Sequence, residues 1–316
     1  MKLIIAPDSY KDALPAGQAA QAIAEGLRRA LPQADLVICP MGDGGEGSLD
    51  ALLEATGAEL RRHVVQDALG RPTLASWGWN PSDQIAYVEL AEASGLQALA
   101  AQERSALHTS TYGVGELIRV ALDVGAQRLL LLLGGSATND AGAGMLTALG
   151  ARLLDEEGTP LSPGGGDLER LHTLEFSGLD PRLRQLQVQV AVDVDNPLTG
   201  PRGASAVFGP QKGASDGDVA RLDAGLATFA GHVNQALGQD YRQTPGAGAA
   251  GGVGFAALAL LQAELRPGIE LIMEHVRFEE LLKSSDLVIT GEGRLDAQSL
   301  AGKTPVGIAR AAKRFE

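Results

Sequence analysis

Short apolar runs that end in glycine-rich or acidic loops recur along the chain, and apolar residues at helical spacing follow several of these loops. Each run is four or five residues long, which suits a strand buried on both faces of a sheet. The clearest runs are residues 3–6, 36–39, 129–133, 188–192 and 286–290. This alternation of buried strand, loop and helix predicts an α/β protein, whose parallel strands bring the following loops to one edge.

Residues 128–150, RLLLLLGGSATNDAGAGMLTALG, show this pattern most clearly. The leucines at 129–133 predict a buried strand, and the glycines that follow predict a tight turn into a helix. Glycines let the backbone approach a ligand, and the free N–H groups of a helix N-terminus attract anions. The segment 134–140 is therefore a candidate phosphate site. An ordinary turn with Asn139 or Asp140 as the helix N-cap is the open alternative.

A different pattern begins near residue 59 and predicts a second domain. Residues 59–66, 73–79 and 85–90 are short runs separated by turn signals, which favours antiparallel strands. Residues 155–186 are rich in loop formers and suit an excursion or a lid. Residues 246–254 contain five glycines and precede an apolar helix.

Composition narrows the class of partner and the compartment. The chain has 26 Lys and Arg against 39 Asp and Glu, and its net charge of −13 disfavours contact with a nucleic-acid backbone. A small anion needs only a local basic pocket and stays compatible with this charge. No apolar run approaches ~18 residues, so we expect no membrane contact. The single cysteine, Cys39, and the short apolar run at the N-terminus predict a cytoplasmic protein.

Carboxylates follow the predicted strands at Asp8, Asp43, Asp193 and Glu292. Carboxylates at strand ends serve as Mg²⁺ ligands or as bases in phosphoryl transfer. Each one taken alone also suits an N-cap, an Asx turn or a weak surface ion pair. Together with the segment 134–140, the pattern recurs at five strand ends, and this recurrence favours a common site.

Other catalytic motifs are absent. No GxGxxG follows the first strand, the five histidines lack zinc-ligand spacing, and no GxSxG occurs. Residues 297–304, AQSLAGKT, fit a relaxed phosphate-loop pattern, but six residues separate them from the preceding strand. A true phosphate loop begins directly after its strand, so this segment does not predict a P-loop fold.

Six segments match the motifs of one known family in the family's order. They are PDSYK at 7–11, MGDGGEG at 41–47, GGSATNDAGAGM at 134–145, DVDNPLTG at 193–200, FGPQKGA at 208–214 and GEGRLDAQSLAGKTPVGIA at 291–309. The chain thereby resembles the type-1 glycerate kinases over nearly its whole length. The resemblance implies ATP-dependent phosphorylation of D-glycerate, at the 2-hydroxyl, with Mg²⁺.

The resemblance also implies a two-domain fold with the active site in the cleft between the domains. Residues 1–64 and 285–316 are expected to form a Rossmann-like domain, with the runs 3–6, 36–39 and 286–290 in one parallel sheet. Residues 65–284 are expected to form an inserted three-layer α/β domain. Tyr10 and Gly42 replace the family's usual Phe and Ala, and the family continues some tens of residues past Arg314, so we expect the terminal domain to be incomplete here.

Site roles follow from the resemblance and the needs of phosphoryl transfer. A carboxylate must orient or deprotonate the hydroxyl, and a cation must hold the glycerate carboxylate. The expected catalytic residues are Asp193, Lys11, Arg294 and Asp296, and the expected substrate-binding residues are Asp8, Ser9, Lys11 and Arg294. Gly134, Gly135, Ser136, Thr138, Asn139, Asp140 and Lys212 are expected around the ATP phosphates, and Asp43, Asp195 and Glu292 around Mg²⁺. The division of roles among the carboxylates stays open.

Three functions remain to be separated. The leading one is a glycerate kinase whose partners are the small molecules D-glycerate and ATP. The alternatives are a non-catalytic hydroxy-acid or nucleotide-binding protein and a hydroxy-acid oxidoreductase, which the missing dinucleotide fingerprint disfavours. The choice between the 2- and 3-phosphorylated product is open, as is the oligomeric state, with a homodimer among the alternatives.

Overall fold

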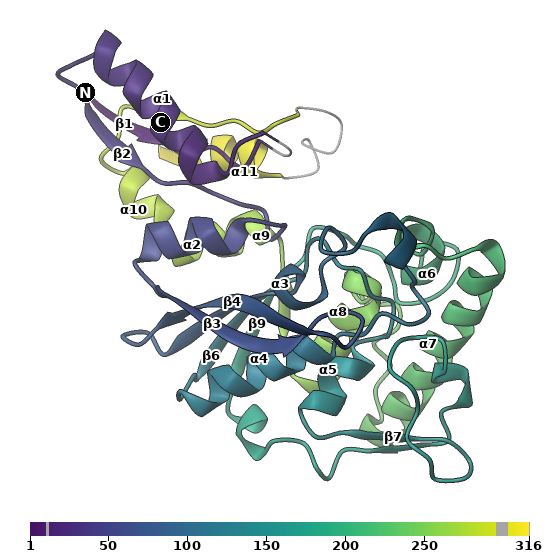
Figure 1. Ribbon diagram of the computed structural model, residues 1–316. Coiled ribbons are helices and arrows are strands. Elements are labelled where there is room, and N and C mark those ends of the chain that lie inside the picture. The colour runs from purple at the N-terminus through teal and green to yellow at the C-terminus, as the bar shows by residue number, and fades with distance from the viewer. Residues whose placement is uncertain (11–12, 295–302, 316) are drawn as a thin grey trace. The chain divides into compact units, whose positions relative to one another are not determined.

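The computed structural model describes residues 1–10, 13–294 and 303–315. The chain divides into two compact units, Met1–Glu59 with Arg266–Glu316, and Leu60–Leu265. Helices accompany the sheet in each unit (Figure 1), which confirms the α/β fold expected from the alternating pattern.

The first unit is built on a parallel sheet with the order β11–β1–β2. Leu3, Ile4 and Ile5 of β1 pair with β11 on one side and with β2 on the other. This confirms that the three runs share one sheet although they come from both ends of the chain. The strands are β1 (Lys2–Ile5), β2 (Asp35–Ile38) and β11 (Leu287–Ile289). The helices are α1 (Ala16–Ala30), α2 (Ser48–Thr56), α9 (Gly268–His275), α10 (Phe278–Leu282) and α11 (Thr304–Ala312), followed by the 3₁₀ turn η6 (Lys313–Phe315).

The second unit holds a six-stranded sheet with the order β10–β9–β6–β5–β4–β3. The pairs β5–β6 and β6–β9 are parallel, whereas β4–β5 is antiparallel as expected from the turn signals. The strands are β3 (Glu59–Gln66), β4 (Pro72–Asn80), β5 (Ile85–Glu89), β6 (Arg128–Leu132), β9 (Gln187–Ala191) and β10 (Glu264–Arg266), and a separate antiparallel pair is β7 (Arg152–Leu154) with β8 (Thr173–Glu175). The helices are α3 (Ala91–Ser94), α4 (Tyr112–Asp123), α5 (Ala143–Ala148), α6 (Ala204–Phe208), α7 (Asp216–Leu237) and α8 (Ala249–Leu260), and the 3₁₀ turns are η1 (Ala101–Glu103), η2 (Leu168–Arg170), η3 (Pro181–Arg184) and η4 (Pro210–Lys212).

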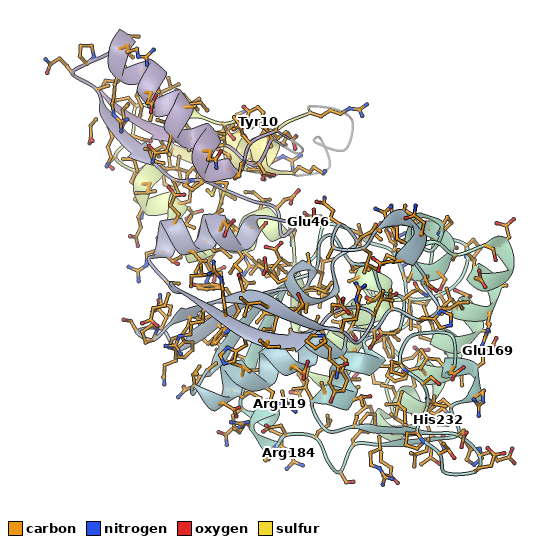
Figure 2. All side chains as sticks on the ribbon, viewed as in Figure 1. Tyr10, Glu46, Arg119, Glu169, Arg184 and His232 are labelled. Carbon is orange, nitrogen blue, oxygen red and sulfur yellow. The ribbon has the colours of Figure 1, made fainter. Side chains whose placement is uncertain are left out.

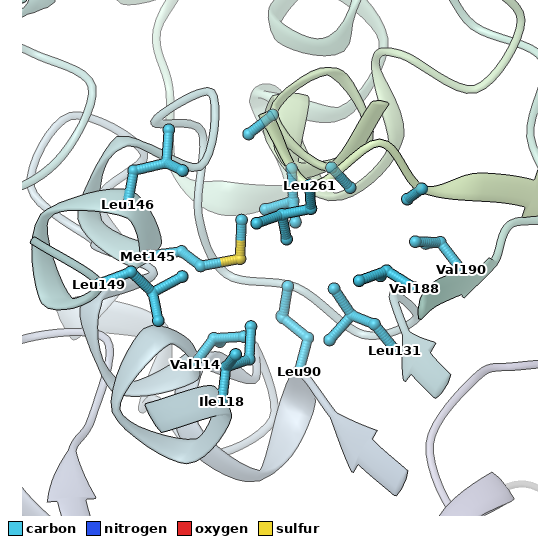
Figure 3. Packing of buried hydrophobic residues seen from close by; sticks show 14 of the residues in the cluster. Leu90, Val114, Ile118, Leu131, Met145, Leu146, Leu149, Val188, Val190 and Leu261 are labelled. Atoms are coloured by element: carbon cyan, nitrogen blue, oxygen red, sulfur yellow. The ribbon is translucent and has the colours of Figure 1, made fainter. Parts of the chain in front are cut away.

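The main core of the second unit lies against one face of this sheet. Leu131 of β6 and Val188 of β9 pack with Met145 of α5 and Ile118 of α4 (Figure 3). Leu130 and Leu132, whose side chains alternate to the opposite face, are also fully buried. The strand is therefore covered on both sides, as its unbroken leucine run predicts.

The chain returns from the second unit to the first between residues 265 and 266, whereas the sequence predicted this boundary between residues 284 and 285. Residues 267–284 contain no strand, and their helices α9 and α10 pack with each other and with α11, while α9 also packs on α2. Gly268 at the start of α9 lies so close to the main chain of Asp43 that a Cβ atom would overlap the Asp43 carbonyl oxygen. This packing joins the segment to the first unit. The chain passes from the first unit to the second between residues 59 and 60 rather than between 64 and 65, because β3 begins at Glu59.

The glycines of residues 246–254 allow α8 to approach the loop that follows β6. Gly251 and Gly252 have φ angles of +68° and +97°, in the left-handed region that favours glycine. A Cβ on Gly251 would overlap the carbonyl oxygen of Thr138, and a Cβ on Gly252 would lie 2.7 Å from Cα of Ala141. The glycine-rich segment thus has a packing role beside the candidate phosphate loop.

We expect Gly251→Ala to destabilise the second unit by at least about 2 kcal/mol, because it adds left-handed strain to a clash with the main chain. Gly231→Ala is the matched control, since Gly231 is exposed on α7, has no atom within 4 Å of a Cβ, and lies in a helix that alanine favours by up to ~1 kcal/mol. Urea unfolding followed by circular dichroism measures the free energy of unfolding of both variants. Equal midpoints for the two variants would contradict the proposed packing role.

Candidate active site

Strand register brings three chemical features to one edge of the sheet in the second unit. Glu89 at the end of β5 is opposite Leu132 of β6, which in turn is opposite Ala191 of β9. The loop 134–140 therefore leaves the sheet between Glu89 and Asp193. Side chains alternate along strands, so Glu89, Leu132 and Ala191 share a face of the sheet.

Glu89 was missed by the sequence reasoning. Glu89 is 4% exposed and is the last residue of β5. The signal was available, because an ionisable residue at the end of a buried strand is rare unless it is paired or functional. Asp193, in contrast, lies two residues beyond β9 with an exposed side chain.

Asp140 anchors the loop that follows β6. Its buried carboxylate accepts hydrogen bonds from the main-chain and side-chain donors of Thr111, both at 2.9 Å, and from the N–H groups of Gly142 and Gly144 at 3.0 and 3.2 Å. Burial raises the pKa of Asp140, and the hydrogen bonds from Thr111 oppose this rise. Because these donors occupy the carboxylate, Asp140 supports the loop and the first turn of α5, as in the alternative expectation of a cap, although α5 begins only at Ala143.

The side chains of Thr138 and Asn139 are also fully buried. The Asn139 amide nitrogen donates to the Ser205 hydroxyl at 2.8 Å, whereas Asn139 Oδ1 and Thr138 Oγ1 have no hydrogen-bond partner in the structure. Gly134 and Gly135 are more accessible, and Gly135 is exposed. Of the residues expected around the ATP phosphates, the glycines at the start of the loop are thus the ones that a phosphate can reach by their main chain.

Lys212 holds the same loop from its buried side. Its Nζ donates to Ser136 Oγ at 2.8 Å and to the Thr138 carbonyl oxygen at 2.7 Å. The side chain is 2% exposed, and burial lowers the pKa of Lys212 to about 7, although the charge of Asp140 opposes this shift. Lys212 was expected to contact phosphate, but its ammonium group is engaged by the loop itself.

The first unit builds a similar edge from β1, β2 and β11. Asp8 follows β1, Asp43 follows β2 and Glu292 follows β11, and the Asp8 N–H donates to the Gly291 carbonyl oxygen at 2.8 Å. Asp8 is 8% exposed, and its carboxylate accepts from the Thr304 hydroxyl at 2.5 Å and from the Ser9 N–H at 2.6 Å.

The charges of Asp43 and Glu292 affect the pKa of Asp8. Burial, together with the nearby charge of Asp43 and a smaller contribution from Glu292, raises the pKa of Asp8 to about 6. The hydrogen bonds from Thr304 and Ser9 oppose this rise. The edge therefore concentrates negative charge that a cation would neutralise.

Tyr10 lies beside this edge (Figure 2). Its main chain pairs with Leu14, and a Cβ added to Gly291 would lie 2.6 Å from the Tyr10 hydroxyl oxygen. The hydroxyl that distinguishes Tyr10 from the phenylalanine of the family pattern is thus packed against the loop that carries Glu292.

Several predicted site residues are placed differently or fall outside the described residues. Lys11 and Asp296 lie outside them, whereas Arg294 is described and exposed. Asp195 belongs to the second unit and forms an exposed ion pair with Arg202 at 2.9 Å. Residues 1–10, 13–294 and 303–315 contain no group of three or more His, Cys, Asp or Glu arranged to hold a metal ion. In the same residues, no helix is long and apolar enough to cross a bilayer.

Comparison with known proteins gives consistent matches over the whole chain. The model of the "Glycerate kinase family" matches residues 3–316. A glycerate kinase from Bacillus subtilis (strain 168) is 51% identical over 316 residues, covering 100% of this chain and 83% of the relative. A glycerate 2-kinase from Escherichia coli (strain K12) is 48% identical over 315 residues, covering 100% and 83%. A solved structure of a candidate glycerate kinase 2 from Salmonella typhimurium LT2 is 47% identical, with a TM-score of 0.94 and coverage of 100% of this chain and 84% of that one.

We expect the pKa of Asp8 to fall in Asp43→Asn, because a like charge is removed, and to rise in Thr304→Val, because the carboxylate loses a donor. Carboxyl ¹³C NMR titration measures both shifts, and Asp240→Asn in the second unit is the control. In the wild type the folded pKa of Asp8, about 6, exceeds the ordinary aspartate value of 3.8. The stability contributed by protonated Asp8 is therefore lost as the pH rises through about 6. An Asp8 pKa unchanged in both variants would refute this electrostatic account.

Proposed function

The chain belongs to the glycerate kinase family, and we propose that it transfers the γ-phosphoryl group of ATP to the 2-hydroxyl of D-glycerate, forming 2-phosphoglycerate and ADP. The observation that carries the proposal is identity of about half of all positions along the complete chain with named glycerate kinases. The choice of the 2-hydroxyl is supported by the relative from Escherichia coli, which is a glycerate 2-kinase.

Phosphoryl transfer depends on positioning and on charge neutralisation. We propose that the main-chain N–H groups of Gly134 and Gly135 hold phosphate oxygens. Asp140, Thr138 and Asn139 are buried supports that keep this loop in shape. The role of each residue then follows from its exposure: the accessible start of the loop binds, and the buried end is structural.

The substrate hydroxyl needs a carboxylate that orients it or accepts its proton. We assign this role to Asp193, which is exposed and follows the strand next to β6. Arg294, with its planar guanidinium, is assigned to the carboxylate of glycerate, together with Ser9 and Lys11.

Mg²⁺ fits the first unit on electrostatic grounds. Burial is the main cause of the raised pKa of Asp8, and the nearby charges of Asp43 and Glu292 add to it. A divalent cation beside these carboxylates would offset the like-charge part. We propose that Asp43 and Glu292 hold the ion. Bound there, Mg²⁺ would offset the negative charge of the ATP phosphates. We do not assign Asp195 to the ion, since its carboxylate pairs with Arg202.

The activity is tested by incubating the chain with ATP, MgCl₂ and D-glycerate. Phosphorus NMR is expected to show ADP and a phosphomonoester signal coupled to the C2 proton. A signal coupled to the C3 protons would correct the position of transfer. Nucleotide binding without any ADP release would support the non-catalytic alternative instead.

Asp193→Asn is expected to lower kcat by about 10²–10⁴-fold, because an amide cannot accept the hydroxyl proton, while ADP binding stays intact. Asp195→Asn is the matched control two residues further on. Its exposed ion pair with Arg202 is worth little, so we expect its kcat to stay within about threefold of wild type. Coupled ADP-release kinetics and calorimetry measure the two effects. A kcat near wild type in Asp193→Asn would remove this residue from the mechanism.

A further inference from the structure

We propose that Lys212 is a positioning residue that sets the direction of the Ser136 hydroxyl, so that Ser136 donates its proton to an anionic oxygen of a bound substrate. The inference deepens the proposed kinase function and rests on it. The anionic oxygen belongs either to a phosphate of ATP or to the carboxylate of glycerate.

The chemistry of the two groups fixes the direction of the hydrogen bond. A lysine ammonium group has three donors and no acceptor. Ser136 Oγ, 2.8 Å from Nζ, must therefore accept, and its own O–H proton must point elsewhere. Among residues 1–10, 13–294 and 303–315 no acceptor is recorded for that proton. The hydroxyl is left as a donor for a ligand.

The position of Ser136 suits this task. Ser136 directly follows the exposed Gly135 at the carboxyl edge of β6, and it is itself 8% exposed. The main chain on either side is fixed, because the Leu96 N–H donates to the Gly135 carbonyl oxygen and the Ala137 N–H donates to the Ser94 carbonyl oxygen, both at 2.8 Å. The hydroxyl thus stands between a buried cation and an accessible glycine turn.

Lys212 is too deeply buried to contact a ligand directly. It is 2% exposed, and its second hydrogen bond, to the Thr138 carbonyl oxygen, turns the ammonium group into the interior. Burying a lysine is costly unless its donors are used and a counter-charge is near. Asp140 supplies the counter-charge from the same loop. Lys212 therefore affects the ligand by orienting the Ser136 hydroxyl and not by contacting the ligand.

The protonation state of Lys212 makes the direction of the Ser136 hydroxyl depend on pH. A neutral amine can accept a hydrogen bond, so above about pH 7 the Ser136 hydroxyl can turn toward Nζ and away from the substrate. Among the described residues, Asp140 is the charged group that acts on the pKa of Lys212. Arg104 contacts the neighbouring Gly213 through its main chain. Below about pH 7 the ammonium form keeps the hydroxyl directed outward.

A double-mutant cycle tests the coupling. Ser136→Ala, Lys212→Met and the double variant are compared at pH 6.5 for kcat and for the KM of ATP and of glycerate, with thermal midpoints as the check of folding. We expect each single variant to raise the same KM by about 10-fold or more, because a hydrogen bond to a charged group is lost. The double variant should exceed either single variant by no more than about twofold. The substrate whose KM rises identifies the anionic oxygen.

Lys283→Met, at an exposed lysine of the first unit, is the matched control and should leave both KM values unchanged. A Ser136→Ala variant that leaves both KM values within about twofold would overturn the proposal. So would single effects that multiply in the double variant, because Lys212 would then act independently of Ser136.

The pH profile separates positioning from general stability. In the wild type the affected KM should rise as the pH increases through about 7, and in Ser136→Ala this component should vanish. Calorimetric titration of ADP and of glycerate, each alone, into wild type and Ser136→Ala provides a readout without turnover. If the wild type turns over no glycerate, the proposed function fails. If it turns over glycerate while both titrations give equal affinities, only the present inference fails.

Discussion

Parallel pairing of β6 with β5 and β9 is the constraint on which the second unit depends. Because all three strands point the same way, Glu89, the glycine loop and Asp193 are delivered to one edge without any direct link between them in sequence. The leucines of β6 make this arrangement rigid, since they are buried on both faces of the sheet. The chemistry of the edge therefore rests on an apolar strand that takes no part in it.

The loop after β6 divides into a buried half and an accessible half. Its buried half contains Asp140, which accepts hydrogen bonds from Thr111, and it receives a hydrogen bond from the buried Lys212 of η4 at Thr138. Such groups stabilise only as a set, because loss of one leaves its partners desolvated and unpaired. The glycines of α8 complete the arrangement by letting the main chain pass close to Thr138. A preorganised loop of this kind can present N–H groups to a phosphate with little reorganisation on binding.

Much of this organisation was predictable from the sequence, and the exceptions have physical reasons. Buried strands and the loops after them could be predicted, because apolar runs and glycines determine the local structure of the chain. The role of Asp140 was open because an N-cap and a ligand contact have the same residue pattern. Lys212 could not be predicted as buried, since the groups that make its burial tolerable lie more than 70 residues away in sequence. The boundary at 265/266 was missed because α9 and α10 join the first unit by packing rather than by a strand.

The pairing of β1 with β11 also orders events during synthesis. Ile4 of β1 pairs with Val288, so β1 lacks this neighbour until β11 has been made. At 5–20 residues per second this delay is on the order of tens of seconds, during which the apolar side chains of β1 lack one neighbour. The second unit, continuous from Leu60 to Leu265, can complete its own sheet within that interval. The nascent chain is thus expected to carry a folded middle and an unfinished beginning, and the exposed edge of β1 is the segment most in need of protection by chaperones.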